Sequence, residues 1–254
     1  MSRVRILAAT LALAVLVAGA SSTAKAGACG VGNIGAETCL YYGGDFNGVN
    51  GLFNDINYAG SLTGIVYDNV LVGSGGWNVN SIFTNNLFLG TSYVQSYYEI
   101  RSGVSPGNGG TLLYSGLSPA SQAYYNGQNG FGLYGFTWET DGLNIHLNPG
   151  QYWISDTPIS YLGNGLTYES TTSGAGCVNC SAHQANNAYF NSSGFGYYFA
   201  PTSAVCTSFA PCSNFSFGVG GSSGGQVTPE PASLMLFGSG LLGLGGVIRR
   251  RLGK

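Results

Sequence analysis

Residues 64–85, GIVYDNVLVGSGGWNVNSIFTN, decide the fold class of this chain. Two runs rich in valine, isoleucine and aromatic residues, Gly64–Val72 and Trp77–Asn85, lie on either side of a glycine and serine turn. β-Branched and aromatic residues favour strands, and glycine supplies the backbone angles that tight turns need. No part of the body of the chain carries the 3.6-residue apolar period of a helix over three turns. The stretch therefore predicts two β-strands.

The same alternation of short apolar runs and turns continues outward. Further strands are expected at Ser92–Ser102, Gly110–Gly116, Phe131–Thr140, Leu143–Leu147, Gly150–Asp156, Gly194–Ala200 and Asn214–Val219. Strands spaced by eight to twelve residues are typical of sandwiches and jelly rolls. We predict an all-β fold with an antiparallel β-sandwich or jelly-roll body at residues 27–217. Residues 218–228, GVGGSSGGQVT, are expected to be a flexible linker.

The N-terminus has the composition of an export signal. Arg3 and Arg5 precede an apolar run from Ile6 to Ala20, and Ala24 and Ala26 bracket Lys25 in a small-x-small pattern. A basic start, a short apolar core and small residues before a cleavage point define a secretory signal peptide. We expect residues 1–26 to form a signal helix that engages the Sec translocon, with signal peptidase cutting after Ala26.

The C-terminus carries a second apolar segment. Residues 232–248 contain no charge, and as a helix of 17 residues they would reach about 26 Å, close to the ~30 Å hydrocarbon core. Arg249, Arg250 and Arg251 follow at once and would hold this end in the cytoplasm, because Lys and Arg resist translocation. We predict a single transmembrane helix. On its outer side Pro229, Glu230 and Pro231 form a rigid, extended tripeptide that a processing enzyme could read.

Residues 229–254 closely resemble the PEP-CTERM sorting signal of Gram-negative bacteria, which joins a Pro-Glu-Pro motif, an apolar helix and a basic cluster. The resemblance implies an exported protein that is held for a time in the inner membrane by its C-terminal helix. Exosortase, a membrane protease of the transpeptidase type, would then cut near the tripeptide and pass the protein to the cell surface or the extracellular space. Such proteins commonly accompany exopolysaccharide and biofilm production. The stretch from Trp77 to Ser155 also looks, more loosely, like the β-sandwich bodies found in front of this signal.

The body of the chain is acidic by formal count. Between residues 27 and 226 only Arg101 is basic, against nine Asp and Glu residues, which makes the formal charge −8. Binding to nucleic acid or to anionic lipid requires clustered Lys and Arg, so the body is a poor partner for either, and we expect no nucleic-acid partner. Arg101 lies two residues from Glu99 in an expected strand, where same-face neighbours would form a structural ion pair.

Six cysteines lie in the exported part of the chain. An even number in an oxidising compartment predicts disulfides, and six cysteines allow 15 pairings. We expect the sequence-local pairs Cys29–Cys39, Cys177–Cys180 and Cys206–Cys212. The stretch CVNCSAH, with His183 and a distant His146, also suggests a zinc site. A single exported CxxC is more typical of a disulfide.

Two further kinds of site are weighed against ordinary structural roles. Glu139 and Asp141 flank Thr140, so in a strand they would share a face, as a glycosidase acid and base do. With Asp68 and Asp156 they are also weak calcium candidates. Trp77, Trp138, Trp153 and the outward rings of the tyrosine doublets could stack on sugars, although aromatic residues also build sandwich cores.

These observations favour a protein that is not an enzyme, with no catalytic residues and no required cofactor. We predict a structural or adhesive surface or matrix protein that associates with exopolysaccharide. The alternative is a carbohydrate-binding module, stabilised by calcium or not. A glycoside hydrolase that uses Glu139 and Asp141 is the remaining class.

Overall fold

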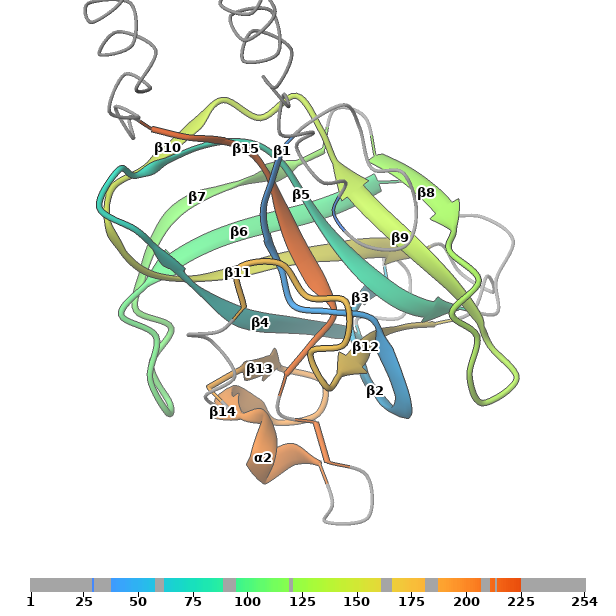
Figure 1. Cartoon of the computed structure of the whole chain (residues 1–254). Helices are drawn as coiled ribbons and strands as arrows, with labels where there is room; N and C mark the ends of the chain where they lie inside the picture. Colours follow the sequence, from blue (N-terminus) through green and yellow to red (C-terminus); the bar gives the residue numbers. More distant parts are fainter. Residues whose placement is uncertain are drawn as a thin grey trace, which may run out of the picture.

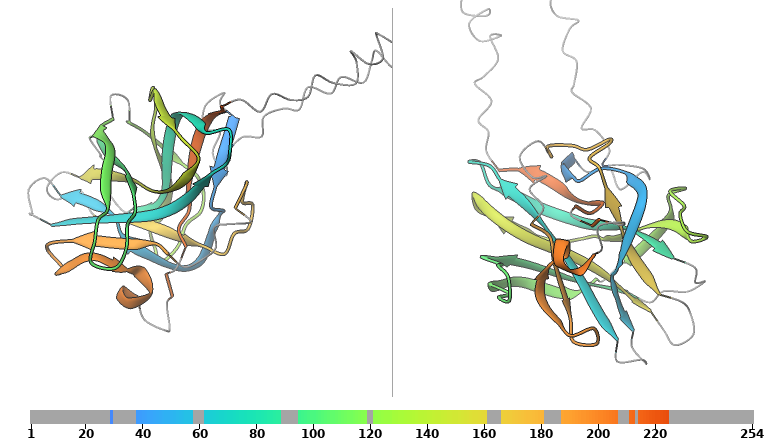
Figure 2. Two further views of the ribbon diagram at one scale, coloured as in Figure 1. Left: turned by 90° about the vertical axis from the view of Figure 1, so that its left-hand side faces the viewer. Right: turned by 90° about the horizontal axis from the view of Figure 1, so that it is seen from below.

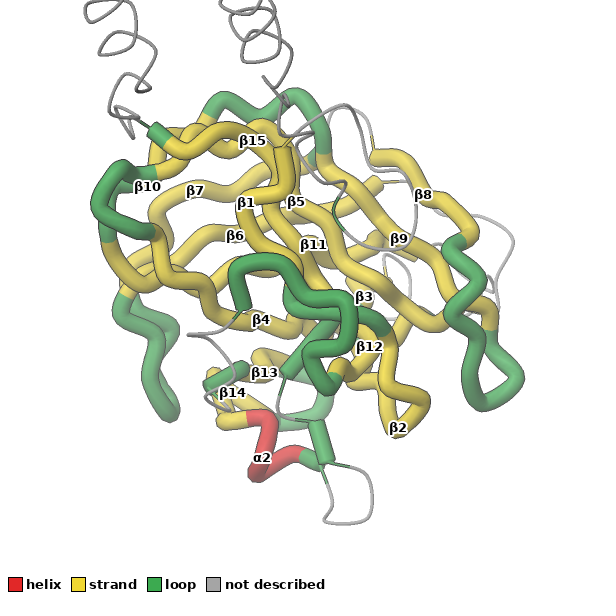
Figure 3. Tube along the Cα trace, viewed as in Figure 1, coloured by secondary structure: helices red, strands yellow, loops and turns green. Residues whose placement is uncertain are grey.

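The structure is a computed structural model. It describes Cys29 and residues 38–57, 62–88, 95–118, 121–160, 166–180, 187–206, 211–212 and 214–224. Two β-sheets pack face to face over these residues, and strands make up nearly all of the regular structure (Figures 1 and 3). The only described helix is α2 (Thr202–Val205), a single turn. The predicted all-β class is confirmed, and apart from one parallel contact the paired strands are antiparallel.

The first sheet has eight strands and is built around the long strand β5. Its members are β1 (Thr38–Tyr42), β2 (Phe46–Phe53), β5 (Trp77–Phe88), β8 (Ser121–Tyr125), β9 (Tyr134–Thr140), β10 (Ile145–Leu147), β12 (Thr167–Thr172) and β15 (Phe217–Ser223). On one side β5 pairs with β15 and β12, and on the other with β10 near its start and β9 near its end. Strand β8 adds to β9 at the edge.

The second sheet has seven strands in the order β14-β13-β4-β3-β11-β6-β7. Its members are β3 (Asp55–Asn57), β4 (Thr63–Val72), β6 (Gln95–Ser102), β7 (Thr111–Leu117), β11 (Gly150–Ser160), β13 (Tyr189–Ser192) and β14 (Tyr197–Pro201). Strands β3 and β11 pair in parallel, and β4 also pairs directly with β11. In the view of Figure 1 this sheet lies behind the first, and the green β6–β7 hairpin is at its edge in the left view of Figure 2.

Apolar side chains from both sheets fill the main core between them. Val79, Ile82 and Phe217 of the first sheet pack with Val70 and Ile154 of the second, and all five are buried. Burying one such side chain stabilises the fold by roughly 1.5–3 kcal/mol. Smaller apolar clusters close the ends of the sandwich, one of them beside the Cys206–Cys212 bridge. Packing in this core fixes the two sheets relative to each other, and with them the edge strands and hairpins that carry the candidate sites.

A polar seam runs beside this apolar core. The Thr84 hydroxyl donates to the Asp156 carbonyl at 2.8 Å and accepts from Nδ2 of Asn86 at 2.8 Å. The Thr157 hydroxyl donates to Oδ1 of Asn54 at 3.0 Å. Each of these side chains is buried, and hydrogen bonds offset the cost of burying them. The second half of β5, SIFTNNLF, is therefore buried throughout although it contains polar side chains. The alternation of polar and apolar residues along a strand would normally place those polar side chains in solvent.

The expected strands all coincide at least in part with strands of the structure. Strands β1, β2, β3, β8, β12 and β13 were not predicted. Strand β2 shows why: its sequence, FNGVNGLF, is rich in glycine and asparagine and is typical of a loop. It is a strand because its pairing with β12 satisfies its backbone groups, a tertiary contact across more than a hundred residues of chain.

The predicted linker is wrong over its first six residues. Residues 218–223 belong to β15, which lies inside the first sheet between β1 and β5. The glycines serve packing here, since a Cβ on Gly218 would lie 2.1 Å from Cζ of Phe83. Gly221 has φ of +151° at a register shift, a backbone angle that favours glycine. The body therefore extends to at least residue 224, and residues 225–228 lie outside the described part.

The three predicted disulfides are confirmed. Cys29 pairs with Cys39, Cys177 with Cys180, and Cys206 with Cys212. The first bridge joins Cys29 to β1, and the third packs against the apolar cluster at the α2 end.

The predicted signal peptide (residues 1–26) and the predicted membrane helix (residues 232–248) both lie outside the described residues. So do Ala24, Ala26, Pro229, Glu230, Pro231, Arg249, Arg250 and Arg251. Within the part of the chain that is described, no helix is long and apolar enough to cross a membrane.

Candidate functional site

The three tryptophans proposed as saccharide contacts are core residues, and that expectation is wrong. Trp77, Trp138 and Trp153 are 8 %, 0 % and 6 % exposed. Trp138 packs edge-on against Phe88 at 5.5 Å between ring centroids, and the Trp153 indole nitrogen donates to the Asn187 carbonyl at 3.0 Å. Rings enclosed in this way cannot stack on a sugar.

The acidic side chains do not form the sites considered for them. Glu139 is 1 % exposed, so its carboxyl cannot reach a glycosidic bond in the way that a hydrolase requires. Asp68 and Asp156 are buried between the sheets, whereas Asp141 follows the end of β9 and is half-buried. Among the described residues, no three His, Cys, Asp or Glu side chains converge to hold a metal ion. His183, the proposed partner of Cys177 and Cys180, lies outside the described residues, and both cysteines are in a disulfide.

Three carboxyl groups instead lie close enough to interact inside the sandwich. Burial raises the pKa of Glu169 on β12 well above its ordinary value, and the nearby Asp68 and Asp156 raise it further. Burial likewise raises the pKa of Asp68 to about 7, opposed by hydrogen bonds from the Phe215 and Asn69 amides. Burial also raises the pKa of Asp156, against hydrogen bonds from Thr140 and Ser96. Desolvation is the common cause, because burial disfavours the charged form of a carboxyl group.

Arg101 is used structurally, as predicted. Its Nε lies 2.5 Å from Oε2 of Glu99, and its Nη1 donates to the Gly109 carbonyl at 3.0 Å. The guanidinium also lies over the rings of Tyr67 and Phe199, at 5.7 and 5.1 Å from their centroids. Its charge is thereby compensated and partly enclosed.

The surface of the described residues consequently carries little charge. Of the eight acids that the structure describes, six are buried, and only Asp45 and Asp141 are half-buried. The rest of the exposed surface consists largely of glycine, serine, threonine, asparagine and tyrosine. The formal charge of −8 therefore overstates the field that a partner meets. Such a surface complements an uncharged, hydroxyl-rich partner better than a polyion.

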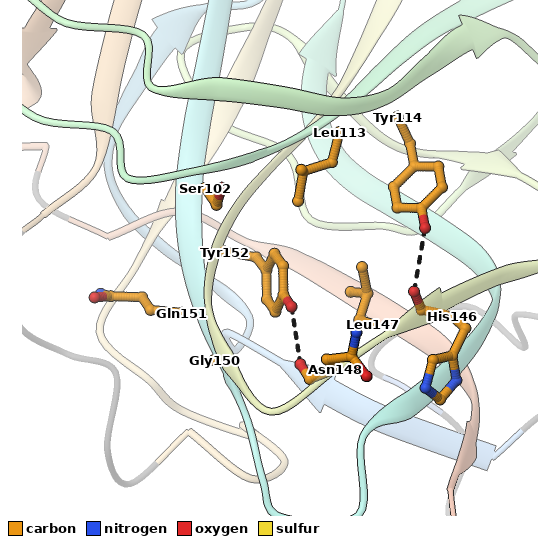
Figure 4. A pocket seen from close by; sticks show the side chains of 9 residues that line it. All are labelled: Ser102, Leu113, Tyr114, His146, Leu147, Asn148, Gly150, Gln151 and Tyr152. Atoms are coloured by element: carbon orange, nitrogen blue, oxygen red, sulfur yellow. Dashed lines mark hydrogen bonds between the residues drawn. The ribbon is translucent and has the colours of Figure 1, made fainter.

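One groove on this surface has the form of a binding site (Figure 4). It has a volume of about 470 Å³ and lies where β7, the β10–β11 turn and the end of β6 meet. Its lining residues are Ser102, Leu113, Tyr114, His146, Leu147, Asn148, Gly150, Gln151 and Tyr152. None of these nine residues is acidic.

Hydrogen bonds to β10 and to the turn that follows it hold the two tyrosines of the groove in place. The Tyr114 hydroxyl donates to the His146 carbonyl at 3.3 Å, and the Tyr152 hydroxyl donates to the Asn148 carbonyl at 2.9 Å. The His146 ring is positioned in turn, since its Nδ1 lies 2.8 Å from Oδ1 of Asn78. Burial raises the pKa of Tyr152, and the nearby Tyr114 raises it further. The turn lies within the stretch LNPGQ, residues 147–151, where proline and glycine favour a turn.

This arrangement suits binding rather than bond breaking. Tyr114 and Leu113 are 38 % and 40 % exposed and offer apolar surface, while His146, Asn148 and Gln151 are exposed polar groups around it. Aromatic faces beside amide and imidazole groups match the alternating C–H and O–H surfaces of a sugar. The groove lacks a carboxylate to act as acid or base. The sequence did not single out Tyr114, because nothing in it beyond a tyrosine on the expected strand Gly110–Gly116 indicates the contact with His146 of β10.

The comparisons with known proteins address the C-terminus. Residues 227–251 match the family model described as the PEP-CTERM protein-sorting motif, in agreement with the resemblance noted from the sequence. Neither the curated proteins nor the solved structures gave a match to the chain. The motif indicates recognition by exosortase and sorting of an exported protein to the cell surface, after transient anchoring in the membrane. The described β-sandwich is therefore the part that is carried there.

Proposed function

We propose that this exported β-sandwich is a non-enzymatic adhesive protein of the cell surface or extracellular matrix that binds uncharged regions of exopolysaccharide. The groove formed by β7 and the β10–β11 turn would be its contact. The observation that carries the proposal is the groove itself: two anchored tyrosines and three exposed polar side chains without an acid.

The charge distribution supports a neutral saccharide as the ligand. Six of the described acids are buried, and Arg101 is compensated by Glu99. A strongly anionic polymer would need a basic surface, and the described residues offer none beyond Arg101. Stacking against tyrosine and hydrogen bonding to amides do not depend on charge. Salt should therefore affect the interaction weakly.

The location of the acids also supports binding without hydrolysis. Glu139 is buried, at 1 % exposed, and neither it nor Asp141, which follows the end of β9, lines the groove. Polysaccharide retention without release of reducing ends is the expected behaviour.

Column retention tests the proposal. The processed protein would be passed over dextran, galactomannan and cellulose beads, and retardation on at least one of them is expected. Tyr114→Ala should reduce retention at least tenfold, because it removes the more exposed of the two tyrosines of the groove. Tyr198→Ala is the matched control, since this tyrosine is 65 % exposed on β14, at the opposite edge of the same sheet. Passage of the wild type through all three columns without retardation would refute the proposal.

A further inference from the structure

A second aromatic surface lies at the other end of the sandwich, on the β8–β9 hairpin. Tyr125 on β8, Tyr134 on β9 and Phe131 in the connecting loop are 58 %, 55 % and 65 % exposed. Large apolar rings that are more than half exposed are costly to leave in water, and a cluster of them marks an interaction site. These three residues are here called the hairpin platform.

The two tyrosines form one continuous row with core aromatic residues. Tyr125 lies opposite Phe136, with 5.8 Å between ring centroids, and 6.3 Å from the Tyr134 ring. Phe136 in turn contacts Trp138 at 5.7 Å, and Trp138 is fully buried. The row thus runs from the core out to solvent, so the exposed rings are backed by a rigid base. A rigid base lowers the entropy lost when a ligand binds.

Side-chain amides hold the connecting loop, residues 126–133. Asn129 donates from Nδ2 to the Tyr125 hydroxyl at 2.9 Å and accepts from the Gly135 amide at 2.9 Å. The buried Asn126 donates to Asn85 and Thr137 and accepts from the Gln128 amide at 2.9 Å. These contacts join the loop to both strands. The platform is therefore preorganised.

Phe131 occupies an unfavourable backbone conformation at the tip of this loop. Its φ is +56°, in the left-handed region, which costs a non-glycine residue about 1 kcal/mol or more. Its ring lies edge-on to the Phe46 ring, with 6.4 Å between the centroids, and Phe131 is still 65 % exposed. Packing in the described structure thus does not account for a large ring at a site that suits glycine. A ligand that covers the ring would account for it.

A shallow hollow beside the platform supplies room and polar groups. It has a volume of about 330 Å³ and is lined by Asn129, Gly130, Gly132, Leu133 and Tyr134. No charged side chain lines it, so its chemistry matches the uncharged groove at the β10–β11 turn. Exposed rings beside an amide again fit the faces and hydroxyl groups of a neutral sugar.

The two surfaces lie at opposite ends of β5. Strand β10 pairs with Trp77–Val79 at the start of β5, whereas Tyr134 of the platform lies opposite Phe88 at its end. Eleven residues of strand at about 3.3 Å each separate these ends by roughly 35 Å. Figure 1 shows β10 and the β8–β9 hairpin at the two ends of the same sheet.

We propose that the hairpin platform is a second saccharide-binding site, specific for neutral hexose polymers, and that the protein bridges two polysaccharide chains. The inference rests on the proposed function and adds to it that each protein molecule has two saccharide-binding sites. One site gives attachment to a polymer. Two sites at opposite ends of β5 can hold two polymer chains at once and so cross-link them. Simultaneous binding at both sites also strengthens attachment to a polymer network, although the affinity of each site is unchanged.

Bridging is measured as the clustering of dextran-, galactomannan- or cellulose-coated beads by the processed protein, followed by light scattering. The test variant is Phe131→Gly, which removes the exposed ring and also relieves the positive φ, so it should not unfold the chain. We expect at least a tenfold loss of clustering, with single-bead retention reduced no more than threefold. The double variant Tyr125→Ala/Tyr134→Ala should behave alike, and Tyr198→Ala should match the wild type.

Each outcome decides between the two levels of the proposal. Undiminished clustering by both platform variants would overturn the second site and leave the groove intact. Retention of the wild type without clustering would overturn bridging alone. Clustering by a protein that sedimentation shows to be a dimer would also overturn it, because two copies with one site each can join two beads. Failure of the wild type to bind any of the beads would instead refute the proposed function on which the inference rests.

Discussion

Glu169→Gln tests the buried acids, because it removes one titrating proton at nearly constant shape. Glu169 is 2 % exposed on β12, and its Oε2 has no hydrogen-bond partner among the described residues. Burial, together with Asp68 and Asp156, raises the pKa of this carboxyl well above its ordinary 4.5. The folded protein therefore keeps the proton at a pH where the unfolded chain has released it. The contribution of this carboxyl group to the free energy of unfolding is therefore fully present below pH 4.5. It is lost as the pH rises towards the folded-state pKa.

The magnitude follows from proton linkage. One proton held only by the folded state lowers the free energy of unfolding by about 1.4 kcal/mol per pH unit. This loss accumulates from pH 4.5 up to the pH at which the folded-state carboxyl ionises. Glutamine carries no such loss, so over this range the stability of Glu169→Gln relative to the wild type should rise by about 1.4 kcal/mol per pH unit. For a body of this size each such unit corresponds to roughly 3–6 °C in Tm.

The assay is calorimetric or urea unfolding of the processed, disulfide-bonded protein from pH 4 to pH 7. At pH 4 the two proteins should agree within about 1 kcal/mol, which makes the low-pH measurement an internal control for packing changes. Above pH 4.5 the curves should diverge, with the wild type losing stability faster. Parallel curves over the whole range would show that Glu169 is ionised in the folded state and would refute the reasoning.

Three further predictions follow from individual contacts. Gly218→Ala should destabilise the protein by about 1–3 kcal/mol, because the new Cβ would lie 2.1 Å from Cζ of Phe83, whereas Gly73→Ala, which has no atom within 4 Å, should leave Tm within about 2 °C. Arg101→Gln should cost about 3–5 kcal/mol in urea unfolding by leaving the buried Glu99 without its cation, and the double variant with Glu99→Gln should recover part of that loss. Cys29→Ala/Cys39→Ala should lower stability by about 3 kcal/mol, since a bridge across ten residues limits the unfolded chain, and equal Tm values for the variant and the wild type would contradict this estimate.

The local features of this protein could be predicted from its sequence. The C-terminal motif, the all-β class and the positions of nine strands depend on residue type and spacing within a dozen residues. The three disulfides join cysteines at most ten residues apart, and Glu99 and Arg101 are same-face neighbours on one strand. Contacts between residues so near in sequence are set by the local geometry of the chain. The ends of a short loop are already close, and residues two apart on a strand point to the same face.

The tertiary structure decided which face of each strand became the core. Alternation shows that a strand has two faces, but only its pairing and the facing sheet determine which of them is buried. Burial also varies along a single face: Trp138 and Tyr134 share one face of β9, yet Trp138 is enclosed and Tyr134 is 55 % exposed, because the row of rings extends from the packed interior into solvent. The groove at Tyr114 and the acids that meet at Glu169 combine strands far apart in sequence. Glycine-rich β15 became a central strand because its lack of side chains leaves room for Phe83.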